Sequence, residues 1–192
     1  MIRAVLCVFA FAATAACGEA SQQSEVPVVV METSKGTIRI ELLPEAAPIT
    51  VVNFLEYVDS GFYDGLIFHR IVPGFVIQGG GYEPDMVKRP TRDAIQNESD
   101  NEVQNLRGTL SMARMPAAHS ATSQFFINLS DNGPLDYGGR PGETWGYAVF
   151  ARVIEGMDVV DAIAQVQTGQ RAGMTDVPVE PVVIEKAYRE TS

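Results

Sequence analysis

Residues 68–80 read Phe-His-Arg-Ile-Val-Pro-Gly-Phe-Val-Ile-Gln-Gly-Gly, and they are the most informative stretch of this 192-residue chain. Pro73-Gly74 divides the stretch into two segments rich in β-branched and aromatic residues, which predicts two short strands joined by a turn. In an extended segment, Phe68 and Arg70 would share one face and His69 would take the other. We expect Phe68 to pack in the core. Arg70 differs, because a guanidinium among apolar side chains needs a partner or an opening to water.

Two later segments have the same character. Residues 108–114 read Gly-Thr-Leu-Ser-Met-Ala-Arg, and residues 123–128 read Ser-Gln-Phe-Phe-Ile-Asn. In the second segment, Gln124 and Phe126 point to one face of the predicted strand and Phe125 to the other. We expect Phe125 to belong to the core.

The rest of the chain predicts many strands and few helices. Most segments show the alternation of a half-buried strand, and only two show apolar residues at helical spacing. Pro48 suits the first turn of one of these helices. Such a pattern indicates an all-β-dominated fold, a closed barrel whose ends are capped by two helices. The predicted strands are residues 28–33, 37–42, the two halves of 66–78, 108–113, 124–129, 147–153 and 181–188, and the helices are 48–61 and 157–167.

Composition narrows the classes of function. Hydrophobic residues make up 46% and charged residues 20%, as in a soluble globular protein of one domain. The chain has 24 acidic and 14 basic side chains, a net charge of -10, which repels phosphate backbones, so we expect no nucleic-acid partner. Two Cys and two His argue against a disulfide framework and against a Cys/His zinc site.

Signatures of hydrolysis and of phosphate binding are missing from the sequence. It has neither a Ser-x-x-Lys nucleophile nor a Gly-x-Ser-x-Gly elbow. Gly79-Gly80-Gly81 lacks the Lys and Ser/Thr of a phosphate-cradling loop and is interpreted as a turn that needs positive φ. We therefore expect a reaction that uses no nucleophile, no metal and no cofactor.

The N-terminus resembles a bacterial export signal. Arg3 precedes an apolar run, residues 4–13, that is too short to span a bilayer but fits the core of a secretory signal. Small residues directly before Cys17 resemble a lipobox, in which that Cys is lipidated and becomes the mature N-terminus. An ordinary signal peptide, cut nearby after an Ala-x-Ala site to leave a soluble periplasmic protein, is the alternative. The predicted organisation is a signal peptide over 1–16, a lipidated Cys17 and flexible tether over 17–25, and a globular domain over 26–192.

The three segments together resemble the cyclophilin family of peptidyl-prolyl cis-trans isomerases, and are closest to its bacterial periplasmic branch. The resemblance covers residues 26–190 and includes the later run Tyr147-Ala148-Val149-Phe150-Ala151-Arg152-Val153. It implies a closed eight-stranded antiparallel β-barrel capped by two α-helices. It also implies an enzyme that accelerates rotation about X-Pro bonds.

The resemblance assigns roles to particular positions. Arg70 matches the catalytic arginine, and Phe75 and Gln78 are placed with it in the catalytic group. Ala113 and Arg114 match the backbone segment that pairs with the substrate peptide. The residues implied to bind substrate are Val76, Ala113, Arg114, Gln124, Phe126, Leu135 and Tyr147.

Four positions depart from the common pattern of the family. Val76 stands where Met is common, and Arg114 stands where Asn is common, which adds a positive charge to the groove. Pro134 replaces a tryptophan that many members carry before Leu135, and Tyr147 replaces a histidine at the groove edge. Because that tryptophan contributes to cyclosporin binding in the family, we expect weak cyclosporin binding. Trp145 is not a positional match for it and is interpreted as a partly exposed loop aromatic.

The implied chemistry is consistent with these residue types. The planar X-Pro amide rotates only over a barrier of about 18–20 kcal/mol, because resonance gives its C–N bond double-bond character. A guanidinium such as that of Arg70 binds the prolyl nitrogen better once twisting has freed its lone pair, which lowers the barrier. The alternative is a module of the same fold that binds proline segments, or acts as a chaperone, without catalysis.

The expected partners are proline-containing peptides and unfolded exported proteins. Nothing in the sequence indicates an oligomer, so we expect a monomer. The expected location is the periplasm, with a membrane reached through lipidated Cys17. The sequence leaves open whether this is the outer or the inner membrane.

Overall fold

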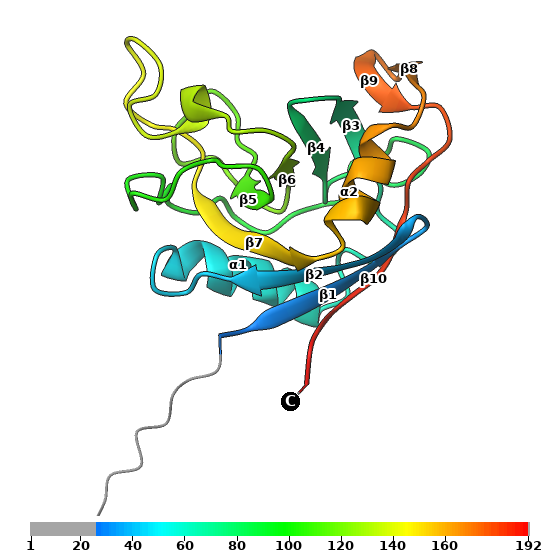
Figure 1. Ribbon diagram of the computed structural model, residues 1–192, viewed down its shortest axis with the longest axis horizontal. Coiled ribbons are helices and arrows are strands. Elements are labelled where there is room, and N and C mark those ends of the chain that lie inside the picture. The colour runs from blue at the N-terminus through cyan, green and yellow to red at the C-terminus, as the bar shows by residue number, and fades with distance from the viewer. Residues whose placement is uncertain (1–25, 192) are drawn as a thin grey trace, which may run out of the picture.

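The computed structural model describes residues 26–191. Its main feature is one sheet of eight strands in the order β10-β1-β2-β7-β5-β6-β4-β3, in which every neighbouring pair is antiparallel. Figure 1 shows that this sheet is strongly curved. The strands are β1 (Val28–Thr33), β2 (Gly36–Leu42), β3 (Phe68–Val72), β4 (Val76–Gly79), β5 (Thr109–Met112), β6 (Phe125–Asn128), β7 (Val149–Glu155) and β10 (Ile184–Arg189).

The barrel is less completely closed than predicted. The two end strands of the sheet, β3 and β10, share no ladder and meet only at one bridge between Ile67 and Val183. Two backbone hydrogen bonds flank this bridge, from Phe68 N to the Val182 carbonyl at 2.9 Å and from Ile184 N to the Leu66 carbonyl at 2.7 Å. A third bond, from Gly65 N to the Ile184 carbonyl at 2.8 Å, continues the contact, so the two edges of the sheet meet over only a few residues.

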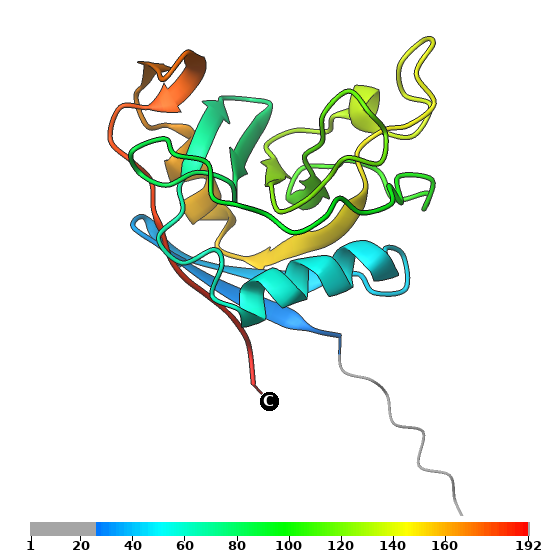
Figure 2. The ribbon, with the colours of Figure 1, turned by 180° about the vertical axis from the view of Figure 1, so that it is seen from behind.

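Two helices complete the architecture, as predicted. Helix α1 (Pro48–Asp59) begins with Pro48 in its first turn and contacts β7 and β10. Its first backbone N–H groups, at Ile49 and Thr50, donate to the Glu98 carboxylate at 3.0 and 2.8 Å, which satisfies donors that have no partner within the helix. Figure 2 shows α1 lying across the lower end of the barrel.

Helix α2 (Met157–Ala164) contacts β2, β3 and β4, and is shorter than the predicted 157–167. The chain turns at Gln165 and enters a hairpin that the sequence pattern did not predict, β8 (Thr168–Arg171) with β9 (Met174–Pro178). Three of the four residues of β8 are exposed, so no apolar alternation marks it. Strand β9 of this hairpin packs against β3.

The interior of the barrel holds the main core, which includes Phe68 and Phe125, both fully buried as predicted. A separate small cluster of Val76, Phe126 and Leu135 lies outside this core. A 3-10 turn, η1 (Gly133–Leu135), supplies Leu135 to it. The fold thus carries a second apolar surface on the outer face of β4 and β6.

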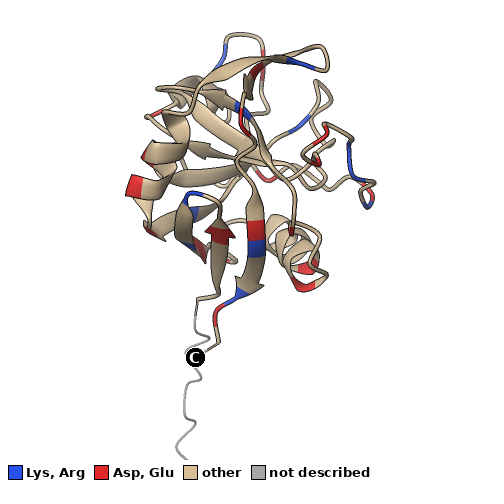
Figure 3. Cartoon of the chain, turned by 90° about the vertical axis from the view of Figure 1, so that its right-hand side faces the viewer, with Lys and Arg blue, Asp and Glu red and all other residues tan. Residues whose placement is uncertain are grey.

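The remaining N-terminal predictions lie outside the described residues, namely the signal peptide over 1–16, Cys17 and the tether to residue 25. Within residues 26–191, none of the helices is both long and apolar enough to cross a membrane. On the side of the molecule shown in Figure 3, acidic and basic positions are interspersed over strands and loops.

Candidate active site

A row of side chains crosses three neighbouring strands on the outer face of the barrel. Arg70 on β3 pairs with Gln78 on β4, and Gln78 pairs with Phe126 on β6. Directly opposed residues of antiparallel strands have Cβ atoms about 4.5–5.5 Å apart. Phe126, which is distant in the sequence, is thereby placed in one row with Arg70 and Gln78.

A β-bulge turns Arg70 to this face. The register of β3 against β4 shifts between Phe68 and Arg70, so that His69 is an extra residue. Phe68 and Ile71 both face the core, three positions apart in place of the usual two. The prediction that Phe68 and Arg70 share a face is therefore wrong, because alternation fails where a bulge inserts one residue.

An apolar pocket adjoins this row. Val76, Phe126 and Leu135 are each buried to within 4% of full burial, and Phe75, Ala113 and Tyr147 pack around them. The ring of Phe126 meets that of Tyr147 edge-on, with centroids 5.5 Å apart. Tyr147 N donates to the Leu135 carbonyl at 2.9 Å, which ties the loop after β6 to the wall of the pocket.

The resulting cavity has a volume of about 240 Å³. Nine of the ten predicted catalytic and substrate-binding residues line it; the tenth, Gln124, contacts one of them. Arg140 also lines it and was missed, because it lies in a Gly- and Pro-rich loop without periodicity. The lining residues are Arg70, Phe75, Val76, Gln78, Ala113, Arg114, Phe126, Leu135, Arg140 and Tyr147.

The two predicted glutamines contact each other. Gln78 Nε2 donates to Gln124 Oε1 at 3.0 Å. Behind them, Gly80 has φ +80°, as the sequence predicts for this turn, whereas Gly81 is needed for space. A Cβ on Gly81 would lie 2.6 Å from Cγ of Gln124. The glycine run thus makes room for the Gln124 side chain.

Arg114 fastens two loops together. Its guanidinium donates to the carbonyls of Trp145 at 2.6 Å, Gly146 at 2.9 Å and Met115 at 3.1 Å. It also lies over the Tyr147 ring, with Cζ 4.8 Å from the centroid. The charge predicted at this position does line the groove, but its N–H donors are engaged by the protein.

Arg70 has a different environment. It is half-buried, and no side-chain hydrogen bond or ion pair joins its guanidinium to another of the residues 26–191. The neighbouring His69 is almost fully buried, and its pKa is lowered to about 4, first by burial and then by the charge of Arg70. Arg70 is thus a cation that lines the cavity next to its apolar residues.

Comparison with known proteins identifies this arrangement. The family model described as "Cyclophilin type peptidyl-prolyl cis-trans isomerase/CLD" matches residues 28–189. The chain belongs to the cyclophilin family. Membership makes this cyclophilin a peptidyl-prolyl cis-trans isomerase, as the resemblance in the sequence implies.

Curated relatives and solved structures agree. A peptidyl-prolyl cis-trans isomerase of Streptomyces antibioticus is 55% identical over 83% of this cyclophilin and 96% of its own length. Peptidyl-prolyl cis-trans isomerase B of Escherichia coli is 51% identical over 82% of this chain and 96% of its own. A Cryptosporidium parvum cyclophilin, crystallised in the presence of the dipeptide Ala-Pro, matches with a TM-score of 0.69 and 25% identity over 86% of this chain and 99% of that one.

Trp145, which the sequence analysis interprets as a partly exposed loop aromatic, lies beside the active site of this cyclophilin. Trp145 is half-buried and borders a neighbouring cavity of about 560 Å³, together with Met115 and Arg140. Its ring meets those of His119 and Tyr137 edge-on.

Among residues 26–191, no group of three His, Cys, Asp or Glu side chains is placed to hold a metal ion.

Proposed function

We propose that this cyclophilin accelerates X-Pro rotation with Arg70 as the catalytic residue and with the pocket of Phe75, Val76, Phe126 and Leu135 holding the proline ring. The observation that carries the proposal is the position of Arg70. Its guanidinium lines the same 240 Å³ cavity as these apolar side chains and is not engaged by another described residue.

The physical argument concerns the lone pair of the prolyl nitrogen. In the planar amide this pair is delocalised, so the nitrogen accepts no hydrogen bond. Twisting localises the pair, and the Arg70 guanidinium then donates to it. The interaction is stronger in the twisted state than in either planar state, which is the condition for lowering the barrier. The apolar wall keeps water from competing for the same donor.

Gln78 and Gln124 position the substrate in this proposal. Each has spare amide donors or acceptors beyond their mutual hydrogen bond. Ala113 N already donates to the Gln124 carbonyl at 2.9 Å. The groups that pair with the substrate backbone are therefore the Ala113 carbonyl and the Arg114 N–H. They hold the residue before proline while the X-Pro amide bond rotates.

The test measures exchange between the cis and trans resonances of a short Ala-Pro-containing peptide by NMR, with residues 26–192 as the enzyme. We expect Arg70→Ala to lower the exchange rate by about 10²–10³-fold, the usual effect of removing one transition-state donor. Arg70→Lys should retain an intermediate rate, because it keeps the charge without the planar fork. Arg171→Ala, an exposed arginine on β8, is the matched control and should exchange like wild type.

Two outcomes contradict the proposal. Equal exchange in the wild type and Arg70→Ala would remove Arg70 from the mechanism. Peptide binding, seen as shifted resonances, without exchange in the wild type would favour the binding or chaperone module in place of the enzyme.

We also propose that the protein acts on unfolded exported proteins in the periplasm, held to a membrane by lipidated Cys17. The support comes from the sequence alone, since Cys17 lies outside the described residues. Mass spectrometry of the mature N-terminus tests it. A lipidated Cys17 is expected, and an unmodified N-terminus near residue 17 would favour the soluble alternative. Fractionation of the two membranes then decides which one holds the protein.

A further inference from the structure

The cavity at the active site has a charge opposite to that of the protein. Three arginines line it, Arg70, Arg114 and Arg140, and none of its lining residues, all of them within 26–191, is Asp or Glu. The whole chain carries a net charge of -10. Long-range repulsion from the protein and short-range attraction from the cavity therefore act in opposite directions on an acidic ligand.

Only one of these three cations remains available to a substrate side chain. Arg70 is assigned to the reacting amide, and the donors of Arg114 are engaged by the carbonyls of Met115, Trp145 and Gly146. Arg140 has a single ionic contact, to Glu143 at 3.7 Å, and the two side chains are 41% and 55% exposed. An exposed pair at this distance is weak and easily exchanged.

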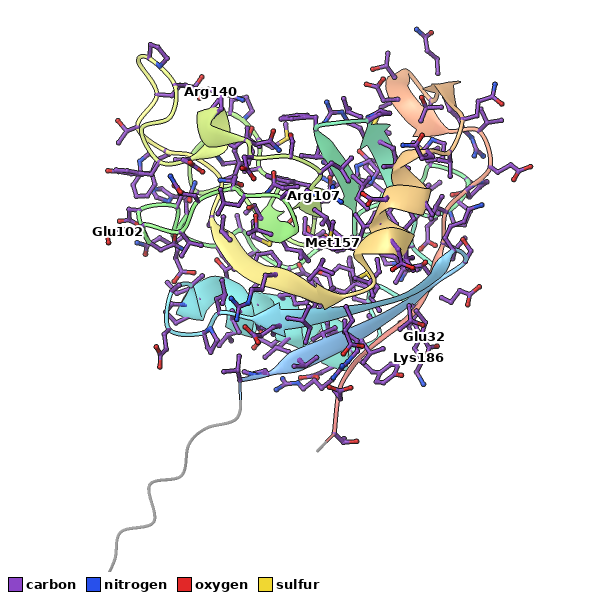
Figure 4. All side chains as sticks on the ribbon, in the orientation of Figure 1. Glu32, Glu102, Arg107, Arg140, Met157 and Lys186 are labelled. Atoms are coloured by element: carbon purple, nitrogen blue, oxygen red, sulfur yellow. The ribbon has the colours of Figure 1, made fainter. Side chains whose placement is uncertain are left out.

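The loop that carries Arg140 presents it to the groove. Arg140 and Glu143 form a bridge across a tight turn, and Gly138 N donates to the Thr144 carbonyl at 2.8 Å below it. Arg114 binds the Trp145 carbonyl and so fixes the base of this loop to the groove wall. Figure 4 shows Arg140 on this loop, above the 3-10 turn. Arg140 lines both the 240 Å³ cavity and the neighbouring 560 Å³ cavity.

We propose that Arg140 is a specificity-determining residue that binds the carboxylate of an Asp or Glu near the substrate proline. The inference rests on the proposed function of the same site. A substrate carboxylate replaces Glu143 as the partner of Arg140, and the guanidinium offers it a two-pronged hydrogen bond. Glu143 therefore acts as a competitor that limits the preference.

The experiment compares peptides that differ only in Glu against Gln, at each of the three positions on either side of proline. The readout is the ratio of the NMR exchange rates, Glu peptide over Gln peptide, at equal concentrations of enzyme and peptide. We expect a ratio of about threefold to tenfold at one or more positions in low salt. It should approach one in 1 M NaCl, where the Debye length is about 3 Å.

Variants assign the preference to Arg140. Arg140→Gln should bring the ratio to about one or below, because the donors of Arg114 are engaged by carbonyls and Arg70 is assigned to the reacting amide, so no guanidinium is left to bind the carboxylate. Glu143→Gln should raise the ratio above that of the wild type. Arg171→Gln removes an equal charge from an exposed position on β8 that lines neither cavity, and it should preserve the ratio.

The outcomes separate this inference from the proposed function. Normal exchange of the Gln peptides with a wild-type ratio of one or less at every position overturns the inference alone. A ratio above one that survives in Arg140→Gln also overturns it. Absence of exchange for every peptide overturns the proposed function, and this inference with it.

Discussion

The Arg114 guanidinium lies over the ring of Tyr147, with Cζ 4.8 Å from the ring centroid. By the resemblance in the sequence, Arg114 stands where Asn is common in the family, and Tyr147 stands where His is common. Two departures from the family pattern are thus in contact. A cation over the face of a tyrosine ring stabilises a protein by about 0.5–2 kcal/mol. The hydrogen bonds from the Arg114 guanidinium to nearby carbonyls stabilise the same arrangement further. The two substitutions form one structural unit at the groove edge.

Arg114→Ala should weaken both the protein and its groove. Its loss removes the hydrogen bonds to Trp145, Gly146 and Met115, for which we expect about 1–3 kcal/mol. For a chain of this size, that lowers the melting temperature by about 2–10 °C. The KM for peptide should rise more than kcat falls, because Arg70 itself is untouched. A melting curve and a KM equal to those of the wild type would contradict this role.

Gly81→Ala should disturb catalysis through Gln124. The added Cβ would lie 2.6 Å from Gln124 Cγ, so this flexible side chain must move and give up its hydrogen bond with Gln78. A hydrogen bond is worth about 1 kcal/mol, which corresponds to roughly a fivefold loss in kcat/KM. In a Gln124→Ala background the same change should cost nothing further, which a double-mutant cycle measures. Additive losses would show that Gly81 acts by another route.

Acid should destabilise the protein through His69. Burial, followed by the charge of Arg70, lowers the pKa of this side chain to about 4 in the folded protein, against about 6.5 in the unfolded chain. Between these values the unfolded chain binds more protons, so the stabilisation present above pH 6.5 is lost as the pH falls towards 4. The loss amounts to about 3 kcal/mol.

Urea unfolding at pH 7 and pH 4.5 measures this effect in the wild type and in His69→Phe, whose ring suits the contact with Tyr82. The difference between the two proteins cancels the titration of the carboxylates. We expect the wild type to lose about 2–3 kcal/mol more than the variant over this range. Equal losses of unfolding free energy in the two proteins would contradict a lowered pKa of His69 in the folded protein.

Cyclosporin should bind weakly. Pro134 is exposed and does not line the cavity, whereas its neighbour Leu135 does, so the position matched to the family tryptophan adds no aromatic surface to the groove. An inhibition titration should give a constant in the micromolar range or above. Pro134→Trp should tighten it by at least about tenfold, since a buried aromatic contact is worth over 1 kcal/mol. Nanomolar inhibition of the wild type would contradict the prediction.

Much of the fold follows from local patterns in the sequence. The eight strands of the main sheet and both helices lie where periodicity places them, within a few residues. Alternation predicts them because each strand has one face against the core. It also places Phe125 inside and Phe126 outside. The β8–β9 hairpin was not predicted, because β8 buries little surface and its sequence therefore shows no alternation of apolar and polar residues.

The residues of the site were identifiable by resemblance to a family, although their arrangement was not. The sequence by itself determined which side chains are available: one arginine amid apolar residues, two glutamines and a set of aromatics. Only the tertiary structure decided that a bulge at His69 turns Arg70 outward, that Arg114 is engaged by carbonyls, and that Arg140 reaches the cavity. The physical reason is that bulges and loop positions are fixed by contacts with distant strands, and such contacts leave no periodic trace in the chain.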